Sequence, residues 1–587
     1  MVFTRQGEHT AVPFSFKNFC RRGGLAVFIT IRREGYYPQE TLPRDIAADY
    51  QKVYHSPIVG VKLDNTLHDL QTPIGETRNL EFVELDSEDG WIIYRRSVAF
   101  LLIGAVRELY DGAEVEVKFR ANNGLYCELV LPGAKLTDAV VKKIEAKMKA
   151  FVKDKRPIHK EVLEKAKAIK LFKQSKQIEK ANLIASLDMA VVSIYRLGDY
   201  YDYLYGAMVD NAAKLDRFAL DRFENGVLLR SPDSQSDGKV PSAIAQPKLS
   251  GVLAESKRWA HILKCRYVTD LNRTIRSGTV GEVIRVSEAL QEKRIGEIAD
   301  YIAMQKKSLR LILIAGPSSS GKTSFAQRLR IQLKVLGLSP ISISLDDYFR
   351  NRQDTPLTAT GTYDYECLEA IDVPQFNKDM LALLSGREVQ LPTYNFITGE
   401  REWRSLPVTI GSDQPIIIEG IHGLNERLSA DIPRANKYKI YISALTQLNI
   451  DGHNRISTTE ARLMRRLVRD YQFRASSALK TLKQWPDVRA GEETYIFPYQ
   501  EDADVMFNSA LIYELAALRR YAVPILKDVP ADAPEYTKAR RLLDFAQYFL
   551  DLPDEDDIPN NSLLREFIGG SVFFPKGKKD ESGSQKD

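Results

Sequence analysis

The sequence predicts an α/β protein, with a parallel sheet in the C-terminal half and smaller α+β units in the N-terminal half. From residue 308 to about 550, short apolar strands alternate with amphipathic helices, a pattern typical of βαβ units. Before residue 250, strand-like segments are mixed with helical stretches in smaller units. A chain of 587 residues is long enough for about three or four domains, each with its own core.

These patterns divide the chain into five expected segments. The first carries strand-like stretches at 26–31 and 58–63 around a short helix. The second begins with a helix at 97–110 and two strands, and continues in a long helical stretch over 142–180. The expected segments are 25–87 (mixed α+β), 95–235 (α+β), 250–306 (helical connector), 308–551 (α/β domain) and 574–587 (disordered tail).

The composition is that of an ordinary folded protein. Hydrophobic residues make up 44% of the chain and charged residues 27%, which excludes a disordered or fibrous protein. The 83 Lys and Arg residues nearly balance the 78 Asp and Glu residues and leave a net charge of +5. This balance argues against a protein dedicated to coating nucleic acid, although it leaves local basic patches open.

The cysteines indicate a reducing compartment, and the apolar stretches are too short to cross a membrane. The four cysteines stand far apart without a Cys-x-x-Cys pair, so we expect neither a disulfide framework nor a zinc ribbon. The longest apolar stretch, Val98 to Val106, is about half as long as a membrane span. The N-terminus lacks a signal-peptide apolar segment, so we expect a cytoplasmic protein without membrane contact. Basic residues before residue 23 leave a mitochondrial location as the alternative.

The strongest motif is Gly316-Pro-Ser-Ser-Ser-Gly-Lys-Thr323, which follows the apolar strand 311–315 and opens an amphipathic helix. A Gly-rich loop in this context is a Walker A loop, whose backbone N–H groups point at phosphate oxygens. Lys322 is expected to reach the β- and γ-phosphates, and the Thr323 hydroxyl to ligate Mg²⁺. The residues expected to bind ATP are Gly316, Pro317, Ser318, Ser319, Ser320, Gly321, Lys322, Thr323 and Ser324.

Carboxylates follow two later strands of the expected sheet. Asp346 comes directly after the strand 341–345, and Glu419 after the strand 416–418. Because ligands bind at the carboxyl ends of parallel strands, we expect both near the γ-phosphate. Asp346 is suited to accept a hydroxyl proton or hold Mg²⁺ through water, and Glu419 to position the metal with Thr323. The alternative is a pair of ordinary loop or capping carboxylates.

An arginine-rich helix comes next in the chain. Its arginines share one face through their three- and four-residue spacing and are Arg462, Arg465, Arg466 and Arg469, with Arg474 shortly after. Guanidinium groups on one face stabilise charge on a transferring phosphoryl group when a lid closes. The alternative is a solvated helix face with salt bridges.

These motifs, in this order, resemble the uridine kinase and phosphoribulokinase family of P-loop kinases over residues 308–520. The resemblance rests on the P-loop, Asp346-Asp-Tyr-Phe-Arg350, Tyr363-Asp364, Leu391-Pro-Thr-Tyr-Asn-Phe396, Glu419-Gly-Ile421 and the arginine helix. Further stretches, among them Ile418-Glu-Gly-Ile-His-Gly-Leu424 and Ile496-Phe-Pro-Tyr499, resemble bacterial-type fused uridine kinases.

The resemblance implies roles for individual residues. Asp346 matches the acid that deprotonates the ribose 5′-hydroxyl, and Asp364 matches a carboxylate that holds the ribose hydroxyls. Tyr394 and Phe396 match positions beside the nucleobase. The catalytic residues expected are Asp346, Lys322, Arg469 and Arg474. The substrate-binding residues expected are Asp364, Tyr394, Phe396 and Arg465, and the metal contacts expected are Thr323, Asp346 and Glu419.

One departure bears on the acceptor. Uridine-cytidine kinases carry a histidine that reads the pyrimidine edge at the position occupied here by Gly399. A missing hydrogen-bond partner removes much of the discrimination between bases. The nucleobase is therefore left open by the sequence.

The N-terminal half resembles two domains of threonyl-tRNA synthetase, the TGS domain over 25–87 and the editing-type second additional domain over 95–230. The matching residues are Arg95-Arg-Ser-Val-Ala99, Leu101-Leu102, Ala105-Val106, Ser193-Ile-Tyr-Arg-Leu-Gly198 and Asp202. The four positions that carry His, His, Cys and His around the synthetase's editing pocket read Phe100, Gly104, Leu204 and Met208. None of these ligates a metal or moves a proton, so we expect a binding or regulatory module.

The sequence therefore predicts an ATP- and Mg²⁺-dependent kinase for the 5′-hydroxyl of a ribonucleoside, with uridine or cytidine as the leading acceptor. One alternative is a kinase for another sugar-like alcohol, of phosphoribulokinase type. The other is an ATP-regulated protein that binds RNA or tRNA through the lysine-rich stretch 142–180, which is otherwise a solvated face. The expected partners are a small-molecule acceptor and an RNA or regulatory ligand, and a homo-oligomer is left open.

Overall fold

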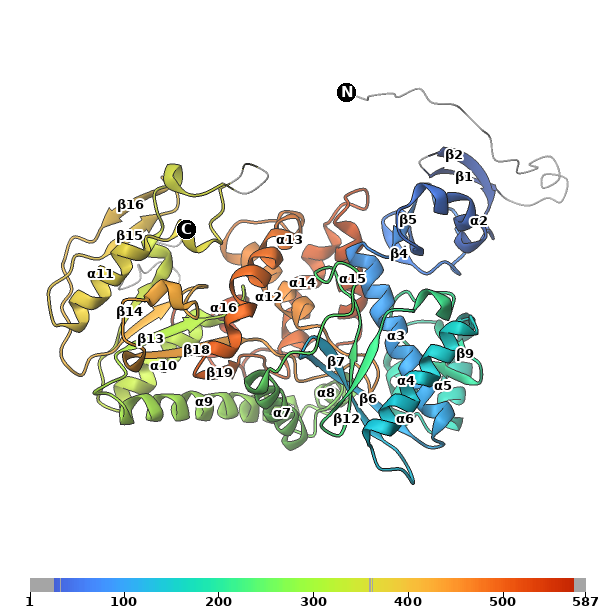
Figure 1. Cartoon of the computed structure of the whole chain (residues 1–587), viewed down its shortest axis with the longest axis horizontal. Helices are drawn as coiled ribbons and strands as arrows, with labels where there is room; N and C mark the ends of the chain where they lie inside the picture. Colours follow the sequence, from blue (N-terminus) through green and yellow to red (C-terminus); the bar gives the residue numbers. More distant parts are fainter. Residues whose placement is uncertain (1–25, 32, 358–360, 362, 575–587) are drawn as a thin grey trace.

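A computed structural model of the chain describes residues 26–31, 33–357, 361 and 363–574. A small N-terminal unit lies at one end of the long axis, next to a second mixed unit, and the C-terminal half occupies the rest (Figure 1). Apart from Phe574, the tail expected at 574–587 lies outside the described residues. None of the helices in the described ranges combines the length and hydropathy needed to cross a bilayer.

The N-terminal unit contains β1 (Ala26–Ile31), β2 (Arg33–Pro38), α2 (Pro43–Tyr50), β3 (Ile58–Leu63), β4 (Thr66–His68) and β5 (Leu80–Glu84). Strands β1 and β2 form a hairpin, and the other three form an antiparallel sheet in the order β4-β3-β5. Asp64 and Asn65 join β3 to β4 with positive φ, the conformation that a tight two-residue hairpin requires. Tyr50, Val61 and Phe82 lie in the core of this unit.

The second unit is an α+β arrangement of two sheets around one buried helix. Its elements are α3 (Glu88–Leu109), β6 (Glu114–Ala121), β7 (Gly124–Val130), α4 (Asp138–Lys153), β8 (His159–Glu164), α5 (Lys165–Gln174), α6 (Ile178–Ser186), β9 (Val191–Leu197), β10 (Tyr200–Asp202), β11 (Ala219–Phe223) and β12 (Gly226–Arg230). The sheets have the orders β11-β12-β7-β6 and β10-β9-β8, both antiparallel. The apolar stretch from Val98 to Val106 is the buried part of α3.

The expected long helical stretch over 142–180 is wrong. The structure divides it into α4, β8, α5 and the start of α6. Helix α4 ends where Lys155 takes a positive φ, and Pro157 follows shortly after. The segment after Pro157 then pairs with β9 over its whole length, so tertiary pairing outweighs its helical composition.

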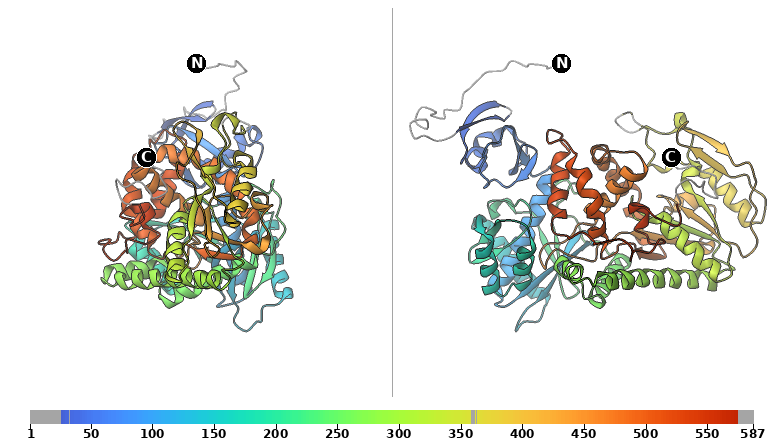
Figure 2. Two further views of the ribbon diagram at one scale, coloured as in Figure 1. Left: turned by 90° about the vertical axis from the view of Figure 1, so that its left-hand side faces the viewer. Right: turned by 180° about the vertical axis from the view of Figure 1, so that it is seen from behind.

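Three helices span the segment expected to be a helical connector. They are α7 (Pro247–Ile262), α8 (Val268–Arg276) and α9 (Val280–Met304). Helix α9 lies along the base of the molecule in the views of Figure 1 and Figure 2. Its Glu292 accepts a hydrogen bond from Arg328 Nε at 3.0 Å, which fixes α9 to the C-terminal half.

The C-terminal half is built on a five-stranded parallel sheet, which confirms the α/β fold class. Its elements are β13 (Leu311–Ala315), α10 (Lys322–Val335), β14 (Ile341–Ser344), α11 (Val373–Leu384), β15 (Pro392–Asn395), β16 (Glu400–Trp403), β17 (Ile416–Glu419), β18 (Lys437–Ser443), α12 (Thr458–Phe473), α13 (Ala478–Tyr495), β19 (Val505–Asn508), α14 (Glu514–Lys527), α15 (Tyr536–Ala546) and α16 (Arg565–Ile568). The strand order is β14-β17-β13-β18-β19. This half continues beyond residue 551, the expected boundary, because Leu563 and Phe567 lie in its cores.

One hydrophobic core joins the two halves. Phe172 and Leu183 of the second unit belong to the same cluster as Leu467 and Trp485 of the C-terminal helices. The boundary between these two parts is therefore a packed core rather than a loose hinge.

A buried polar network crosses the same boundary. Lys180 pairs with Asp202 at 2.5 Å and with Asp451 at 3.3 Å, and His453 Nδ1 lies 2.6 Å from Asp202 Oδ2. Burial alone would raise the pKa of Asp202, but Lys180 and His453 together hold it well below its usual range. The charges of the two halves thus neutralise one another in the interior.

Candidate active site

The P-loop connects β13 to α10. All five residues of β13 are buried, and the chain then turns with positive φ at Ser319 and Gly321. A side chain at Gly316 would sit 2.0 Å from the carbonyl oxygen of Ile442 in β18, so only glycine fits there. This is the strand–loop–helix context that a Walker A sequence requires.

Lys322, the first residue of α10, is folded back on the loop. Its Nζ donates to the carbonyl oxygens of Gly316 at 2.9 Å and Pro317 at 3.2 Å. Burial lowers the pKa of Lys322, while nearby carboxylates oppose this effect. The charged residues that act on it are Glu419, Glu566, Asp346 and Arg469.

Thr323 and Glu419 are brought together at the end of β17. Thr323 Oγ1 donates to Glu419 Oε1 at 2.8 Å. Hydroxyl and carboxylate oxygens suit Mg²⁺, which is commonly held by one or two carboxylates together with substrate phosphates. Across the described ranges, no group of three or more His, Cys, Asp or Glu side chains forms a metal site by itself. These donors therefore fit a metal that is shared with a phosphate substrate.

Asp346 lies in a 3₁₀ turn, Leu345–Tyr348, that directly follows β14. Its backbone N–H donates to Ser344 Oγ at 3.3 Å, and its side chain is exposed within electrostatic range of Lys322. Its neighbour Asp347 is engaged differently, in an ion pair with Arg404 at 3.1 Å. Of the two adjacent aspartates, Asp346 thus acts on the charge of the lysine, and Asp347 is held by Arg404.

Glu366 is a further carboxyl group at this site that the sequence analysis did not single out. Burial raises its pKa to about 7, and the carboxylates of Glu492 and Asp346 add to the effect. A Cβ at Gly491 in α13 would lie 3.1 Å from its side chain, so α13 packs closely over it. The signal that could have found it is its position two residues after Asp364.

Arg462 and Arg465 are buried beneath the P-loop. Arg462 Nη2 donates to Glu492 Oε2 at 2.7 Å. Arg465, with an exposed fraction of 0%, pairs with Glu514 and donates to the carbonyl oxygen of Ser509 at 2.9 Å. Protein groups thus take Nη1 and Nη2 of Arg465, which was expected to contact substrate, and its Nε has no hydrogen-bond partner among the described residues.

The same two arginines hold the P-loop backbone from below. Arg462 Nη1 donates to the carbonyl oxygen of Ser318 at 3.1 Å, and Arg465 Nη1 to that of Ser319 at 3.3 Å. They thereby satisfy loop carbonyls and leave the loop N–H groups to other partners. Their function is to position the loop.

The other expected arginines, on α12 and at its C-terminal cap, contact the P-loop less or not at all. Arg466 Nη1 donates to Ser318 Oγ at 2.7 Å. Arg469 pairs with Asp470 at 2.8 Å and lies within electrostatic range of Lys322. Arg474 is half-exposed, 3.8 Å from the carboxylate of Asp470. Among the expected lid residues, Arg469 is the one beside the lysine.

Two carboxylates from other helices contact the P-loop region. The backbone N–H of Ser318 donates to Glu492 Oε1 at 2.9 Å. Ser324 donates from its N–H and its hydroxyl to Glu566 Oε2, at 3.2 and 2.7 Å. Ser324, expected to contact ATP, is buried and instead holds α16 to the start of α10. Pro317, Ser319 and Ser320 are buried within the loop.

The aromatic residues expected beside a nucleobase lie in the β15–β16 hairpin. Tyr394 is buried, with its ring 5.5 Å from that of Phe349, and Phe396 is 62% exposed with its ring 5.1 Å from that of Tyr394. Asp364 Oδ1 accepts the N–H of Glu366 at 3.0 Å, so one of its oxygens stabilises a turn. The structure therefore brings the two aromatic residues together and gives Asp364 a local partner.

Gly399 and Arg352 meet at the turn of this hairpin. Gly399 has a φ of +78°, and a Cβ there would lie 2.6 Å from Arg352 Cζ. Arg352 Nη2 donates to the carbonyl oxygen of Phe396 at 3.0 Å. A guanidinium thus occupies the space beside the aromatic cluster where the resemblance places a histidine.

The four editing-type positions of the second unit are filled by apolar packing. Phe100, Leu204 and Met208 are buried, and the ring of Phe100 lies 5.1 Å from that of Tyr200. A side chain at Gly104 would meet Leu197 at 3.0 Å. None of the four positions therefore carries a polar catalytic group.

The comparisons with known proteins divide the chain in the same way. Residues 311–514 match the model of the Phosphoribulokinase / Uridine kinase family. The N-terminal part is similar to threonine–tRNA ligases, 32% identical over 185 residues to that of Syntrophotalea carbinolica and 33% over 165 residues to that of Acidithiobacillus ferrooxidans. The chain is a fusion of these two kinds of segment. The alignments cover 31% and 28% of the fusion but only 29% and 26% of the ligases, so the fusion spans less than a third of their length.

Two solved structures are similar to the fusion at low identity. One is a Bacillus stearothermophilus protein described as a possible uridine kinase, at 20% identity and a TM-score of 0.26, covering 37% of the fusion and 98% of that chain. The other is D-glycerate 3-kinase from Cryptococcus neoformans, at 16% identity and a TM-score of 0.19, covering 45% and 89%. The name kinase segment is used below for residues 311–514, which match the family model and contain the P-loop.

Proposed function

We propose that the kinase segment transfers the γ-phosphoryl group of ATP to the 5′-hydroxyl of a ribonucleoside, with uridine or cytidine as the leading acceptor. One observation carries the proposal, namely that Asp346 lies within electrostatic range of Lys322, at the carboxyl ends of strands β14 and β13, which flank β17. A proton acceptor next to a phosphate-binding lysine is the minimum that phosphoryl transfer to an alcohol requires.

In this mechanism each residue acts at a stated atom. The P-loop amides and Lys322 bind the phosphates of ATP, and the Asp346 carboxylate accepts the proton of the attacking hydroxyl. Lys322 and Arg469 stabilise the charge that develops on the phosphoryl oxygens. Thr323 and Glu419 would hold Mg²⁺, which neutralises phosphate charge when bound.

A second acceptor class is favoured by Arg352. Its guanidinium stands beside the aromatic hairpin at Gly399, where a nucleoside kinase of the resembling group has a base-reading histidine. Its Nε and Nη2 already donate to Tyr365 Oη at 3.3 Å and to the Phe396 carbonyl oxygen, so Arg352 offers its Nη1 and its positive charge to an acceptor that already carries an anionic group. The alternative function is therefore phosphorylation of a sugar phosphate or a sugar acid.

The test is a panel of nucleosides, sugars, sugar phosphates and sugar acids, incubated with the whole chain and Mg²⁺-ATP. ADP release and the mass of each product are measured. We expect a nucleoside to gain one phosphoryl group. If only anionic acceptors react, the second candidate replaces the first, and if no acceptor is phosphorylated, the kinase proposal fails.

A further inference from the structure

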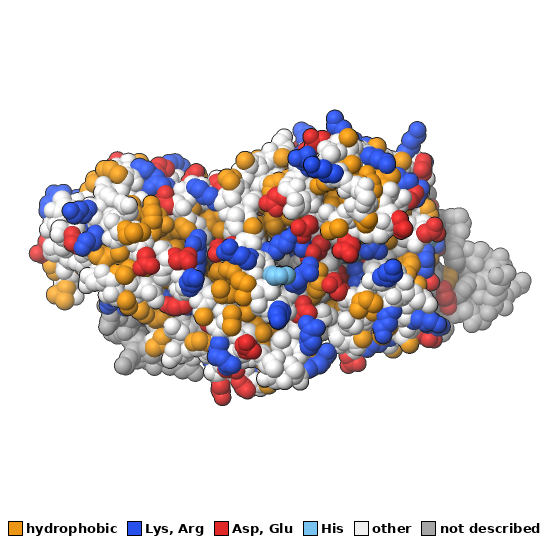
Figure 3. Space-filling view, turned by 90° about the horizontal axis from the view of Figure 1, so that it is seen from below, with side chains coloured by type: hydrophobic (Ala, Val, Ile, Leu, Met, Phe, Trp, Pro, Cys, Tyr) orange, Lys and Arg blue, Asp and Glu red, His pale blue; other side chains and the backbone are white. Residues whose placement is uncertain are grey.

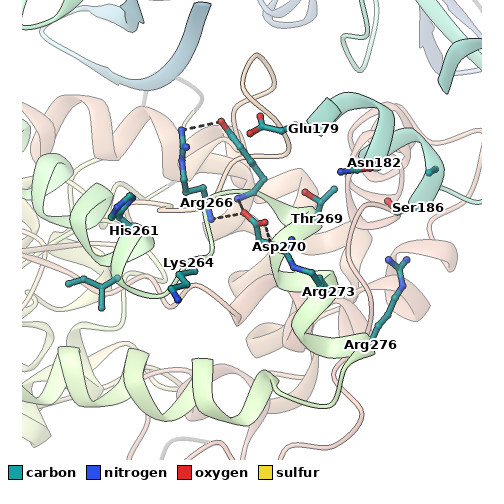
Figure 4. Close-up of a pocket in the computed structure, with 13 residues that line it drawn as sticks. Glu179, Asn182, Ser186, His261, Lys264, Arg266, Thr269, Asp270, Arg273 and Arg276 are labelled. Atoms are coloured by element: carbon teal, nitrogen blue, oxygen red, sulfur yellow. Dashed lines mark hydrogen bonds and ion pairs between the residues drawn. The ribbon is translucent and has the colours of Figure 1, made fainter. Parts of the chain in front are cut away.

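A hollow of about 1100 Å³ lies outside the kinase site, between α6 and the corner formed by α7 and α8. We call it the α6–α8 groove. Figure 4 shows that its polar side chains come from three elements. They are Asn182 and Ser186 of α6, His261 and Lys264 at the end of α7, and Arg273 and Arg276 of α8. None of them belongs to the phosphoryl-transfer site.

Basic groups outnumber acids around the groove. Lys264, Arg266, Arg273, Arg276 and His261 line it, against Glu179 and Asp270. Arg266 pairs with Glu116 at 2.8 Å, and Arg273 pairs with Asp270. Within the described ranges, the side chains of Lys264 and Arg276 make no ion pair or hydrogen bond with another residue. Two cations on the wall are thus left without a protein counter-charge.

The two acids of the groove have other functions or are easily neutralised. Asp270 accepts the backbone N–H groups of Arg266 at 3.0 Å and Tyr267 at 3.1 Å, which fixes the start of α8. Burial raises the pKa of Glu179 against the pull of Arg266, so its charge is readily lost beside an anion. The field in the groove therefore favours a negative ligand.

We propose that the α6–α8 groove binds a small ligand that carries adjacent phosphate groups. Lys264, Arg273 and Arg276 contact the phosphates, because guanidinium forks bind phosphate oxygens in pairs and Lys supplies a point charge. Asn182, Ser186 and Thr269 supply neutral hydrogen-bonding groups on the walls. A volume of about 1100 Å³ is at the upper end of small-molecule sites.

A nucleic acid fits the groove less well. Among the described residues that line it, Tyr267 is the one Phe, Tyr or Trp side chain, and it is only 6% exposed, with Arg266 5.2 Å above its ring. Unpaired bases therefore have the exposed imidazole of His261 as their one accessible ring in the described lining, which is a small stacking surface. On the underside of the molecule, Lys and Arg side chains gather near the centre but are interspersed with acidic ones (Figure 3). This mixture differs from the continuous basic stripe that a nucleic-acid backbone requires.

The test uses inorganic tripolyphosphate as the probe and calorimetric titration of the whole chain. The background variant is Lys322→Ala, which weakens binding at the P-loop and leaves the groove intact. We expect this variant to bind one tripolyphosphate. Adding Arg273→Ser and Arg276→Ser should weaken that binding at least about tenfold, since each charged hydrogen bond contributes about that much.

Matched controls separate the groove from general charge and from misfolding. Arg258→Ser with Lys293→Ser removes two exposed cations that do not line the groove, and should leave binding unchanged. Arg276→Ser alone removes a side chain without described partners, so a loss of binding there is not a folding defect. Binding that is absent from Lys322→Ala, or that survives the loss of Arg273 and Arg276, overturns the proposal. So does a short RNA that binds through these arginines while tripolyphosphate does not.

Discussion

The two segments of the fusion differ in what occupies the place where chemistry is expected. In the kinase segment, Lys322, Thr323 and Glu419 are charged or polar groups held close together at the end of a sheet. In the ligase-like segment, the buried apolar side chains of Phe100 and Met208 occupy two of the editing-type positions. Both segments keep a recognisable fold, so the comparison teaches that a few side chains decide whether a fold carries out a reaction.

The largest effect is expected from removing Asp346, the proposed proton acceptor of the kinase segment. Asp346→Asn should lower turnover about 10²- to 10⁴-fold and leave ATP binding nearly intact, because the amide accepts no proton. Turnover and the ATP dissociation constant are measured on the same preparation. Asp347→Asn is the matched control, since Asp347 pairs with Arg404, and it should cost far less. Unchanged turnover in Asp346→Asn would contradict the assignment of Asp346 as the reactive group that distinguishes the kinase segment from the ligase-like segment.

The next effect tests whether the buried arginine of α12 supports the site rather than touching substrate. Arg465→Met leaves Glu514 buried without its partner and should lower the free energy of unfolding by about 3–5 kcal/mol. Denaturant unfolding measures this loss. Arg520→Met, an exposed position on α14, should change stability by less than about 0.5 kcal/mol. If both variants are equally stable, Arg465 is available for substrate after all.

A smaller effect is expected at the boundary between the segments. Asp202→Asn removes the carboxylate that faces Lys180 and His453, and should cost about 1–3 kcal/mol. The cost is smaller than for Arg465 because Lys180 keeps Asp451 as a partner. Thermal unfolding should also broaden as the two segments become less coupled. Asp199→Asn, on the exposed turn nearby, is the control, and an equal response from both would show that the network does not join the segments.

The smallest effect is a change in how the free energy of unfolding depends on pH, and it is expected from replacing Glu366. Its pKa of about 7 in the folded protein exceeds the ordinary value of 4.5, because the site buries it. The folded state therefore binds the proton more tightly, and stability should fall as the pH rises from about 4.5 to about 7. Glu366→Gln should remove this part of the fall in urea titrations without ligand. Glu369→Gln, at an exposed position in the same segment, should leave it, and parallel curves for wild type and Glu366→Gln would contradict the assignment.

The fold of the kinase segment followed from its sequence because local patterns agree with the tertiary structure. The strands before Gly316 and Glu419 are short, apolar and followed by polar groups, as buried parallel strands are, and the edge strand before Asp346 alternates Ile with Ser. Strands β19 (Val505–Asn508) and β8 (His159–Glu164) were harder to predict from the sequence. Each takes its conformation by pairing with a strand elsewhere in the chain. A short stretch of sequence does not determine such pairing by itself.

The motifs of the candidate site could be predicted from the sequence, but the residues that hold these motifs in place could not. The P-loop and the Thr323–Glu419 contact follow from residue types in a known order. The burial of Arg465 could not be predicted in this way. Helical spacing shows which arginines share a face, but it does not show which acidic residue pairs with them. Arg352 escaped notice for the same reason, as its approach to Gly399 depends on a hairpin turn that the sequence leaves unspecified.

The most direct test of the central claim offers the chain phosphoryl acceptors and a misacylated tRNA in one reaction. The whole chain is incubated with Mg²⁺-ATP, the pooled acceptor panel and a misacylated tRNA, and the products are identified by mass. The account predicts one acceptor that gains a phosphoryl group, in a reaction that disappears in Lys322→Ala, and a tRNA that keeps its amino acid. A deacylated tRNA with no phosphorylated acceptor would contradict it.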